Sequence, residues 1–362
     1  MKISSYNITD VGYHYIGLRV LAGLPSTSKR DEQTSAISRS VLKYVTDRSL
    51  RFMLPEPKGT FETVGEKVCQ ELVHFQFARS VQKSYELTNA GKEALALLDG
   101  RKHRELRRVM VAVHLNTYEN LRAIVQRHIE IGYIWRPIVE AAKLATPDYL
   151  YRLLKPSYEN DARDVADEVW EGAKGKSPKK VEDLLHEQIL QRVLPRISLN
   201  VPLFRSLCDR LVSLRILNIM RTSSGGCEFD KSYSPCAITS PSDDWYIPIK
   251  VHGLSGEFFT LFYCEPSMGE KTAQQRLLAA VDEAFHIISP QAGYYDLPNV
   301  RDYVCDYLRI PEASFDEGIN ELLDWNPAPL TVGLKYEGIS ARRKPLMRNL
   351  GSIQIYNLIR RT

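Results

Sequence analysis

One short pattern recurs along this 362-residue chain: helices lead into an extended run, which a turn then breaks. The clearest copy is YELTNAGKEALALL, residues Tyr85 to Leu98. Tyr85, Leu87 and Thr88 suit a half-buried strand, whereas Asn89-Ala90-Gly91 ends it, and Thr or Asn can cap the helix that follows. Because a strand delivered directly into a helix is a specific piece of architecture, its recurrence constrains the fold more than composition does.

Three helices are predicted before this strand, over 13–24, 34–54 and 63–77. The third carries apolar residues at helical spacing: Val64, Val68, Leu72 and Phe75. Residues 1–100 therefore form the first predicted unit, in which three helices are closed by a strand and a turn.

Two later segments repeat the pattern. Residues 181–240 predict two helices, over 181–194 and 201–217, then two strands joined by the glycine turn SSGG at 223–226. Residues 294–362 predict helices Val300–Leu308 and Phe315–Leu323, the second capped by Ser314 with Glu317 as capping-box partner. Two β-rich runs follow, PLTVGLKYEG at 329–338 and SIQIYNLIRR at 352–361, joined by a basic loop.

The intervening segments differ in character. Residues 101–172 predict a helical spacer, with one basic helix from Arg101 to His128 and an acidic stretch at 161–171; a Gly/Lys/Pro linker at 172–180 marks the best internal boundary. Residues 245–290 predict a hairpin of two apolar strands around 253–256 and one helix over 271–288, a combination of unassigned type. The expected fold class is α+β, mostly α-helical, with several domains.

The phrase Y-x-L-T-x-x-G-x-x-x-L, from Tyr85 to Leu95, resembles the wing-to-helix phrase common in prokaryotic winged-helix proteins. With Leu211–Phe229 and Phe315–Ile359 it covers roughly half the chain and resembles the winged helix-turn-helix superfamily. The resemblance implies two or three winged-helix units joined by helical spacers. Chains of this kind resemble prokaryotic replication initiators, chromosome-organising accessory subunits and DNA-sensing components of antiviral phage-defence systems.

The basic C-terminal segment is the strongest sign of DNA binding. From Lys335 to Thr362 there are seven Lys or Arg residues and one acid. Guanidinium and ammonium groups on a protruding loop are what phosphate contacts require. We therefore expect this predicted wing to contact DNA through Arg342, Arg343, Lys344 and Arg348.

Two further basic surfaces are candidates. The second unit would contact DNA through Arg205 and Arg210, and the basic helix through Arg104, Arg107 and Arg108. The alternative for the basic helix is that Glu105, Glu119 and the acidic stretch at 161–171 neutralise it internally. In the first unit the polar side chains predicted to face away from the core are Lys67, Gln70, Glu71 and His74. In the third they are mostly acidic, namely Asp316, Glu317, Asn320 and Glu321, which is a poor surface against phosphate.

Signs of catalysis, cofactors or metals are weak. Eight histidines show no H-x-x-x-H or H-E-x-x-H spacing, no glycine turn has the residues of a P-loop, and six cysteines form no C-x-x-C pair. Asp243, Asp244 and Lys250 faintly resemble a nuclease carboxylate–lysine site, although their spacing departs from it. We therefore expect no enzyme activity, no metal and no cofactor, and reduced thiols.

Neither an eighteen-residue apolar run nor a signal-peptide core is present, so we expect a cytoplasmic protein with no membrane partner. The net charge of +4 permits a nucleic-acid partner without requiring one. The sequence predicts a non-catalytic subunit that binds double-stranded DNA within a larger prokaryotic assembly that includes protein partners. A winged-helix scaffold that docks proteins is the alternative, and a nuclease is a weaker third.

Overall fold

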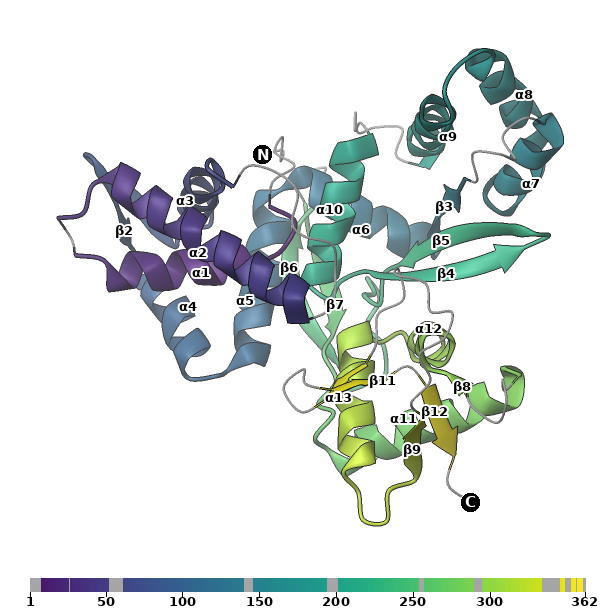
Figure 1. The fold of residues 1–362 in the computed structure, drawn as a ribbon. Helices are drawn as coiled ribbons and strands as arrows, with labels where there is room; N and C mark the ends of the chain where they lie inside the picture. The colour runs from purple at the N-terminus through teal and green to yellow at the C-terminus, as the bar shows by residue number, and fades with distance from the viewer. Residues whose placement is uncertain are drawn as a thin grey trace.

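The computed structural model describes residues 8–25, 27–51, 61–139, 146–193, 201–253, 257–289 and 295–333, and the strand residues 346–348, 353–355 and 357–360. The chain is α+β, with helices predominating and five small sheets among the described residues. The units lie around a central region, with α1–α4 on one side, α7–α9 on another and α11–α13 on a third (Figure 1).

The first unit contains α1 (Gly12–Gly23), α2 (Arg30–Arg51), α3 (Val64–His74), the antiparallel strands β1 (Ala78–Val81) and β2 (Ser84–Leu87), and α4 (Asn89–Asp99). The strand predicted at Tyr85 passes directly into α4, as expected. Thr88 caps this helix, because its hydroxyl accepts a hydrogen bond from the Gly91 amide at 3.1 Å. The helix begins earlier than predicted, and Asn89-Ala90-Gly91 forms its first turn.

Gly91 is required there by close packing. A Cβ atom at this position would lie 2.0 Å from the carbonyl oxygen of Phe77, just before β1. The helix start therefore lies directly against the hairpin, and only a residue without a side chain allows this approach.

The spacer differs from its prediction at Tyr118. The single helix expected from Arg101 to His128 is two helices, α5 (His103–Thr117) and α6 (Glu119–Ile131), because the backbone of Tyr118 is extended. Strand β3 (Ile134–Ile138) and helices α7 (Pro147–Tyr158) and α8 (Ala162–Ala173) follow. The predicted linker after α8 is a short turn into α9 (Pro178–Val193), and α8 and α9 pack against each other.

The second unit continues with α10 (Val201–Ser213) and the hairpin β4 (Asn218–Ser224) and β5 (Cys227–Tyr233). Gly225 and Gly226 both have positive φ, of 55° and 81°, which is the conformation that a tight two-residue hairpin turn needs. The sequence predicted this turn but not the third strand: β3, from before α7, pairs with β5 and gives the order β3-β5-β4.

The described part of residues 245–290 contains the predicted strands and helix. Strands β6 (Tyr246–His252) and β7 (Phe258–Cys264) form an antiparallel hairpin, and α11 (Lys271–Ile287) follows.

The last unit contains β8 (Tyr295–Asp296), α12 (Leu297–Leu308), α13 (Glu312–Leu323), β9 (Leu330–Gly333) and β12 (Asn357–Arg360), with β10 (Leu346–Arg348) and β11 (Ile353–Ile355) paired to each other. The strand order β8-β12-β9 has the same pattern as β3-β5-β4: in each sheet the first strand in sequence pairs with the last. The predicted cap at Ser314 is wrong, because α13 already begins at Glu312, after Pro311, and Ser314 is a buried residue inside it.

Among the described residues, two hydrophobic cores hold these elements together. The larger combines side chains from the first unit, the spacer, the second unit and the β6–β7 hairpin, for example Leu72, Leu121, Leu211 and Leu261. The smaller lies around α11–α13 and includes Met220 and Tyr233 from the second sheet. Among the described residues no helix has the length and apolar character needed to span a bilayer.

Candidate nucleic-acid interface and a buried charge cluster

The predicted DNA-contacting residue Arg210 of α10 is buried, with 1% of its surface exposed. Its Nη1 atom donates to both carboxylate oxygens of Glu71 on α3, at 3.1 and 3.0 Å, and its Nε atom donates to the carbonyl oxygen of Ile8 at 2.8 Å. The predictions that Arg210 and Glu71 face outward are therefore wrong. A guanidinium and a carboxylate removed from water must satisfy each other, and here they do so between two units.

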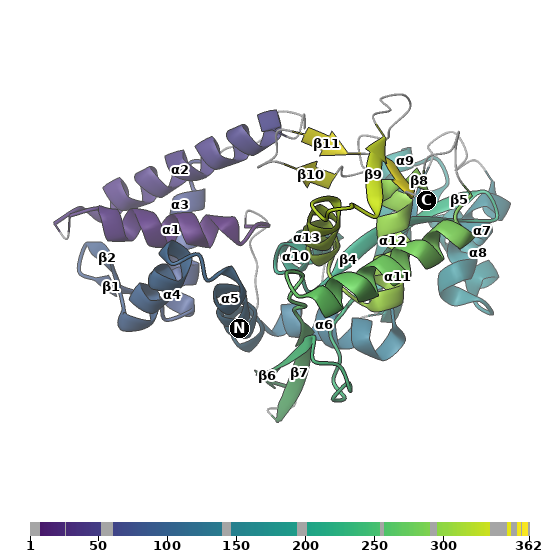
Figure 2. The ribbon, with the colours of Figure 1, turned by 90° about the horizontal axis from the view of Figure 1, so that it is seen from below.

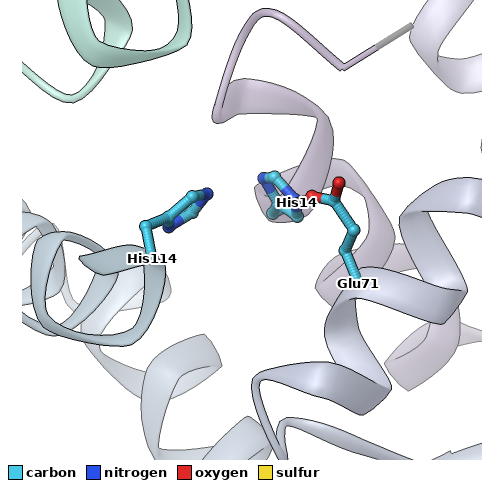
Figure 3. Close-up of side chains that lie close together, drawn as sticks. All are labelled: His14, Glu71 and His114. Carbon is cyan, nitrogen blue, oxygen red and sulfur yellow. Dashed lines mark hydrogen bonds and ion pairs between the residues drawn. The ribbon is translucent and has the colours of Figure 1, made fainter. Parts of the chain in front are cut away.

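Two histidines complete this cluster (Figure 3). The Nε2 atom of His14, on α1, donates to Glu71 at 2.7 Å, since a carboxylate can only accept. The ring of His114, on α5, lies edge-on to His14 with 5.1 Å between the ring centroids, and its Nδ1–H donates to the carbonyl of Met110. The charge cluster defined by His14, Glu71, His114 and Arg210 therefore joins four helices.

The pKa shifts in this cluster are those of an Arg210–Glu71 ion pair beside an uncharged His114. Burial alone would raise the pKa of Glu71, but the Arg210 charge and the His14 hydrogen bond outweigh it and lower that pKa to about 2. Burial, followed by the neighbouring His14 and Arg210, moves the pKa of His114 well below its usual value. Glu71 is thus ionised and His114 uncharged at neutral pH.

The same residues are the metal candidate of the described chain, because ligand atoms of His14, Glu71 and His114 lie within 4.8 Å of one another. Sequence spacing gave no signal of this, since the three come from different helices. They do not fit a cation well: both oxygens of Glu71 already accept hydrogen bonds from Arg210, and a metal ion would lie beside that guanidinium. The arrangement is that of a structural ion-pair network.

The other predicted arginines outside the C-terminal segment are mostly engaged within the chain. Arg205 donates to Glu182 at 2.9 Å and to His186 at 2.8 Å. Arg107 forms a bidentate pair with the buried carboxylate of Glu265, and Arg104 donates to the backbone oxygen of Glu265 at 2.7 Å.

The basic helix is thus partly neutralised internally, and Glu265 supplies the partner of Arg107 and Arg104. Arg108 is exposed. Arg342, Arg343 and Lys344 lie outside the described residues, as does the side chain of Arg348, whose backbone ends β10.

The first unit carries three lysines outside its core, which we call the Lys29–Lys67–Lys83 face; Lys29 and Lys83 are exposed, and Lys67 is half-buried. Lys29 precedes α2, Lys83 is at the β1–β2 turn, and Lys67 lies on α3. The ammonium groups of these three lysines make no ion pair within the described part of the chain. Gln70 and His74 are exposed farther along α3, and Gln70 donates a hydrogen bond at 3.1 Å to the exposed carboxylate of Glu66 on the same helix.

Several contacts hold the hairpin against α2. The Arg30 amide donates to the carbonyl of Lys83 at 2.6 Å, and its guanidinium donates to Ser80 and lies over the Tyr85 ring. The Gln33 side chain bonds both backbone groups of Tyr85, at 2.9 and 2.7 Å. Lys29 and Lys83 are therefore presented by a fixed scaffold. The sequence correctly indicated that Gln70 and His74 of α3 face outward, whereas Glu71 is buried. It did not indicate that the hairpin turn lies beside the start of α2.

A cleft of about 1380 Å³ lies between the first unit, the end of α10, β4 and the starts of α12 and α13. Its lining contains arginines and carboxylates that pair with one another, among them Arg48 with Asp10, Arg136 with Asp230 and Arg301 with Asp316. Asp243, of the faint nuclease resemblance, pairs with Arg276 and accepts from the Trp245 amide. Charged side chains of the cleft, and Asp243, are thus engaged in ion pairs within the chain.

Comparison with known proteins gives no match for this chain: no family model fits it, and neither a curated protein nor a solved structure is significantly similar.

Proposed function

We propose that this chain is a non-catalytic protein that binds double-stranded DNA as a subunit of a larger prokaryotic assembly, and that its first unit makes the principal contact. In this proposal, helices α1–α3 and the β1–β2 hairpin form a winged helix-turn-helix. In helix-turn-helix proteins a recognition helix enters the major groove, and neighbouring cations contact the phosphates.

The observation that carries the proposal is the Lys29–Lys67–Lys83 face. It combines an exposed polar helix face with lysines at the hairpin turn and at the start of α2, where phosphate contacts would form. The corresponding helix α10 is unsuited to this role because Arg210 is buried against Glu71. The exposed side of α13 carries Glu317 and Glu321, which repel phosphate.

The repeated strand orders β3-β5-β4 and β8-β12-β9 support the same reading of the other units. In the proposal they are winged-helix units, the second with α7 and α8 inserted after its first strand, and they hold the first unit and bind protein partners. A scaffold that docks proteins without DNA is the second candidate, favoured by the acidic side of α13 and the buried face of α10.

The test is fluorescence anisotropy of the full chain with a labelled duplex of random sequence, titrated at several salt concentrations. Replacing Lys67 and Lys83 by Ala should weaken binding and reduce the magnitude of the slope of log K against log salt by about 0.9 for each lost phosphate contact. The charge-matched control is Lys174→Ala with Lys176→Ala, two exposed lysines near the α8–α9 turn.

If the first-unit variant and the control bind alike, the first-unit assignment is wrong. If the unaltered chain fails to bind even at low salt, the scaffold candidate replaces DNA binding.

A further inference from the structure

The two outer edges of the β6–β7 hairpin differ in what covers their backbone groups. On the β6 edge, the Asn116 side chain from α5 donates to the carbonyl of Lys250 at 3.2 Å and accepts from the amide of His252 at 3.0 Å. One side-chain amide thus satisfies two of the backbone groups that a neighbouring strand would otherwise bind. Helix α5 also packs against β6, so it covers this edge at Lys250 and His252.

Within the described residues, the β7 edge has backbone partners only toward its C-terminal end, at Phe262 and Cys264. Phe262 and Ala237 exchange both backbone hydrogen bonds, at 2.9 and 2.7 Å, in a single antiparallel bridge. Successive residues of a strand direct their backbone groups to opposite edges, so Phe258 and Thr260 point theirs to the same side as Phe262. Within the described residues neither has a partner on that side.

The composition of β7 makes this edge unusual. Its sequence FFTLFYC contains no charged residue and no proline, which are the features that normally protect an exposed edge. Phe258 is 65% exposed, and its ring lies against His252 with 4.1 Å between centroids. The hairpin projects from the molecule near α5 and α6 (Figure 2).

We infer that β7 binds a short extended segment of a partner protein, which adds to the sheet as an antiparallel strand beside Phe258 and Thr260. Only an extended backbone offers the alternating donors and acceptors that these two residues present, and an apolar side chain of the segment would cover Phe258.

The segment must be short, because Ala237 already occupies the place beside Phe262. A second copy of β7, which is seven residues long, would run into the Ala237 segment, so self-pairing is disfavoured. This inference does not depend on DNA binding, and its site is in a different unit from the Lys29–Lys67–Lys83 face.

The experiment measures binding of a short fluorescein-labelled peptide of alternating valine and threonine to the full chain by anisotropy. Thr260→Pro removes the outward N–H and should weaken binding by about tenfold or more, as expected for lost backbone hydrogen bonds. Thr260→Ala keeps the N–H and is the matched control, for which we expect unchanged affinity.

Peptides N-methylated on alternate amides give a second test that needs no variant protein. One methylation phase blocks the amides that face β7 and should abolish binding, whereas the opposite phase should bind as the parent does. Equal affinities of the two phases, or equal affinities of the Thr260→Pro and Thr260→Ala chains, would overturn the inference. So would a dimer in sedimentation velocity that Thr260→Pro abolishes, because the edge would then pair with a second copy.

Discussion

Arg210 of α10 and Glu71 of α3 form a bidentate ion pair in the interior, with N–O distances of 3.0 and 3.1 Å, although 139 residues separate them in the sequence. The pair connects the third helix of the first unit to the helix that precedes the β4–β5 hairpin. It also decides which helix faces are available to partners, since α10 uses its arginine to hold α3.

Removing one member of this pair should destabilise the chain strongly. Arg210→Met leaves the Glu71 carboxylate buried with less compensation, and we expect a loss of about 3–5 kcal/mol in the free energy of unfolding. Urea unfolding, followed by circular dichroism, measures it. The double variant Arg210→Met with Glu71→Met removes both charges and should recover much of the loss; a double variant no more stable than the single one would contradict this account.

The pH dependence of stability should report buried His128. Burial lowers its pKa from 6.5 to about 4, with a partly opposing hydrogen bond to Ile124. The unfolded chain therefore binds the proton more readily, so this contribution is complete above pH 6.5 and is lost as the pH falls toward 4, amounting to about 3 kcal/mol at most.

Urea unfolding of the unaltered chain and of His128→Gln, between pH 7.5 and about 4.5, tests this. The glutamine variant cannot titrate and should show a shallower decline. Parallel pH profiles for the two chains would assign the acid sensitivity to other groups.

Gly91 should be intolerant of any side chain. In Gly91→Ala the added Cβ would meet the Phe77 carbonyl at 2.0 Å, so helix and hairpin must separate, at a cost of about 1–3 kcal/mol or more. Gly23→Ala is the matched control, because a Cβ there meets nothing within 4 Å. Thermal unfolding of the two variants compares them; similar melting temperatures would show that the helix start can shift freely.

The C-terminal arginines remain a prediction from the sequence. Changing Arg342 and Arg343 to Ala should weaken duplex binding and reduce the salt slope by about one for each lost phosphate contact. Salt-dependent anisotropy measures both quantities. Unchanged affinity and slope would restrict DNA contact to the described units.

Hydrophobic spacing and turn residues determined the local elements well. The stripe of α3, the Thr88 cap, the Gly225-Gly226 turn and the β6–β7 hairpin all depend on residues close in sequence, and each was predicted from them. Two helix boundaries differ from their predictions: the helix predicted from Arg101 to His128 is interrupted at Tyr118, and α13 begins directly after Pro311.

Tertiary structure alone decided that Arg210 and Glu71 are buried. Arg210 and Glu71 lie on polar sides of their own helices, where local patterning predicts exposure; they are buried because two units pack on those sides and each charge supplies the other's partner. Likewise β3 pairs with β5 although helices α7 to α10 lie between them in the sequence, and Asn116 of α5 hydrogen-bonds the outer edge of β6, far along the chain. Such pairings depend on how the units meet in space, which periodicity along the sequence does not encode.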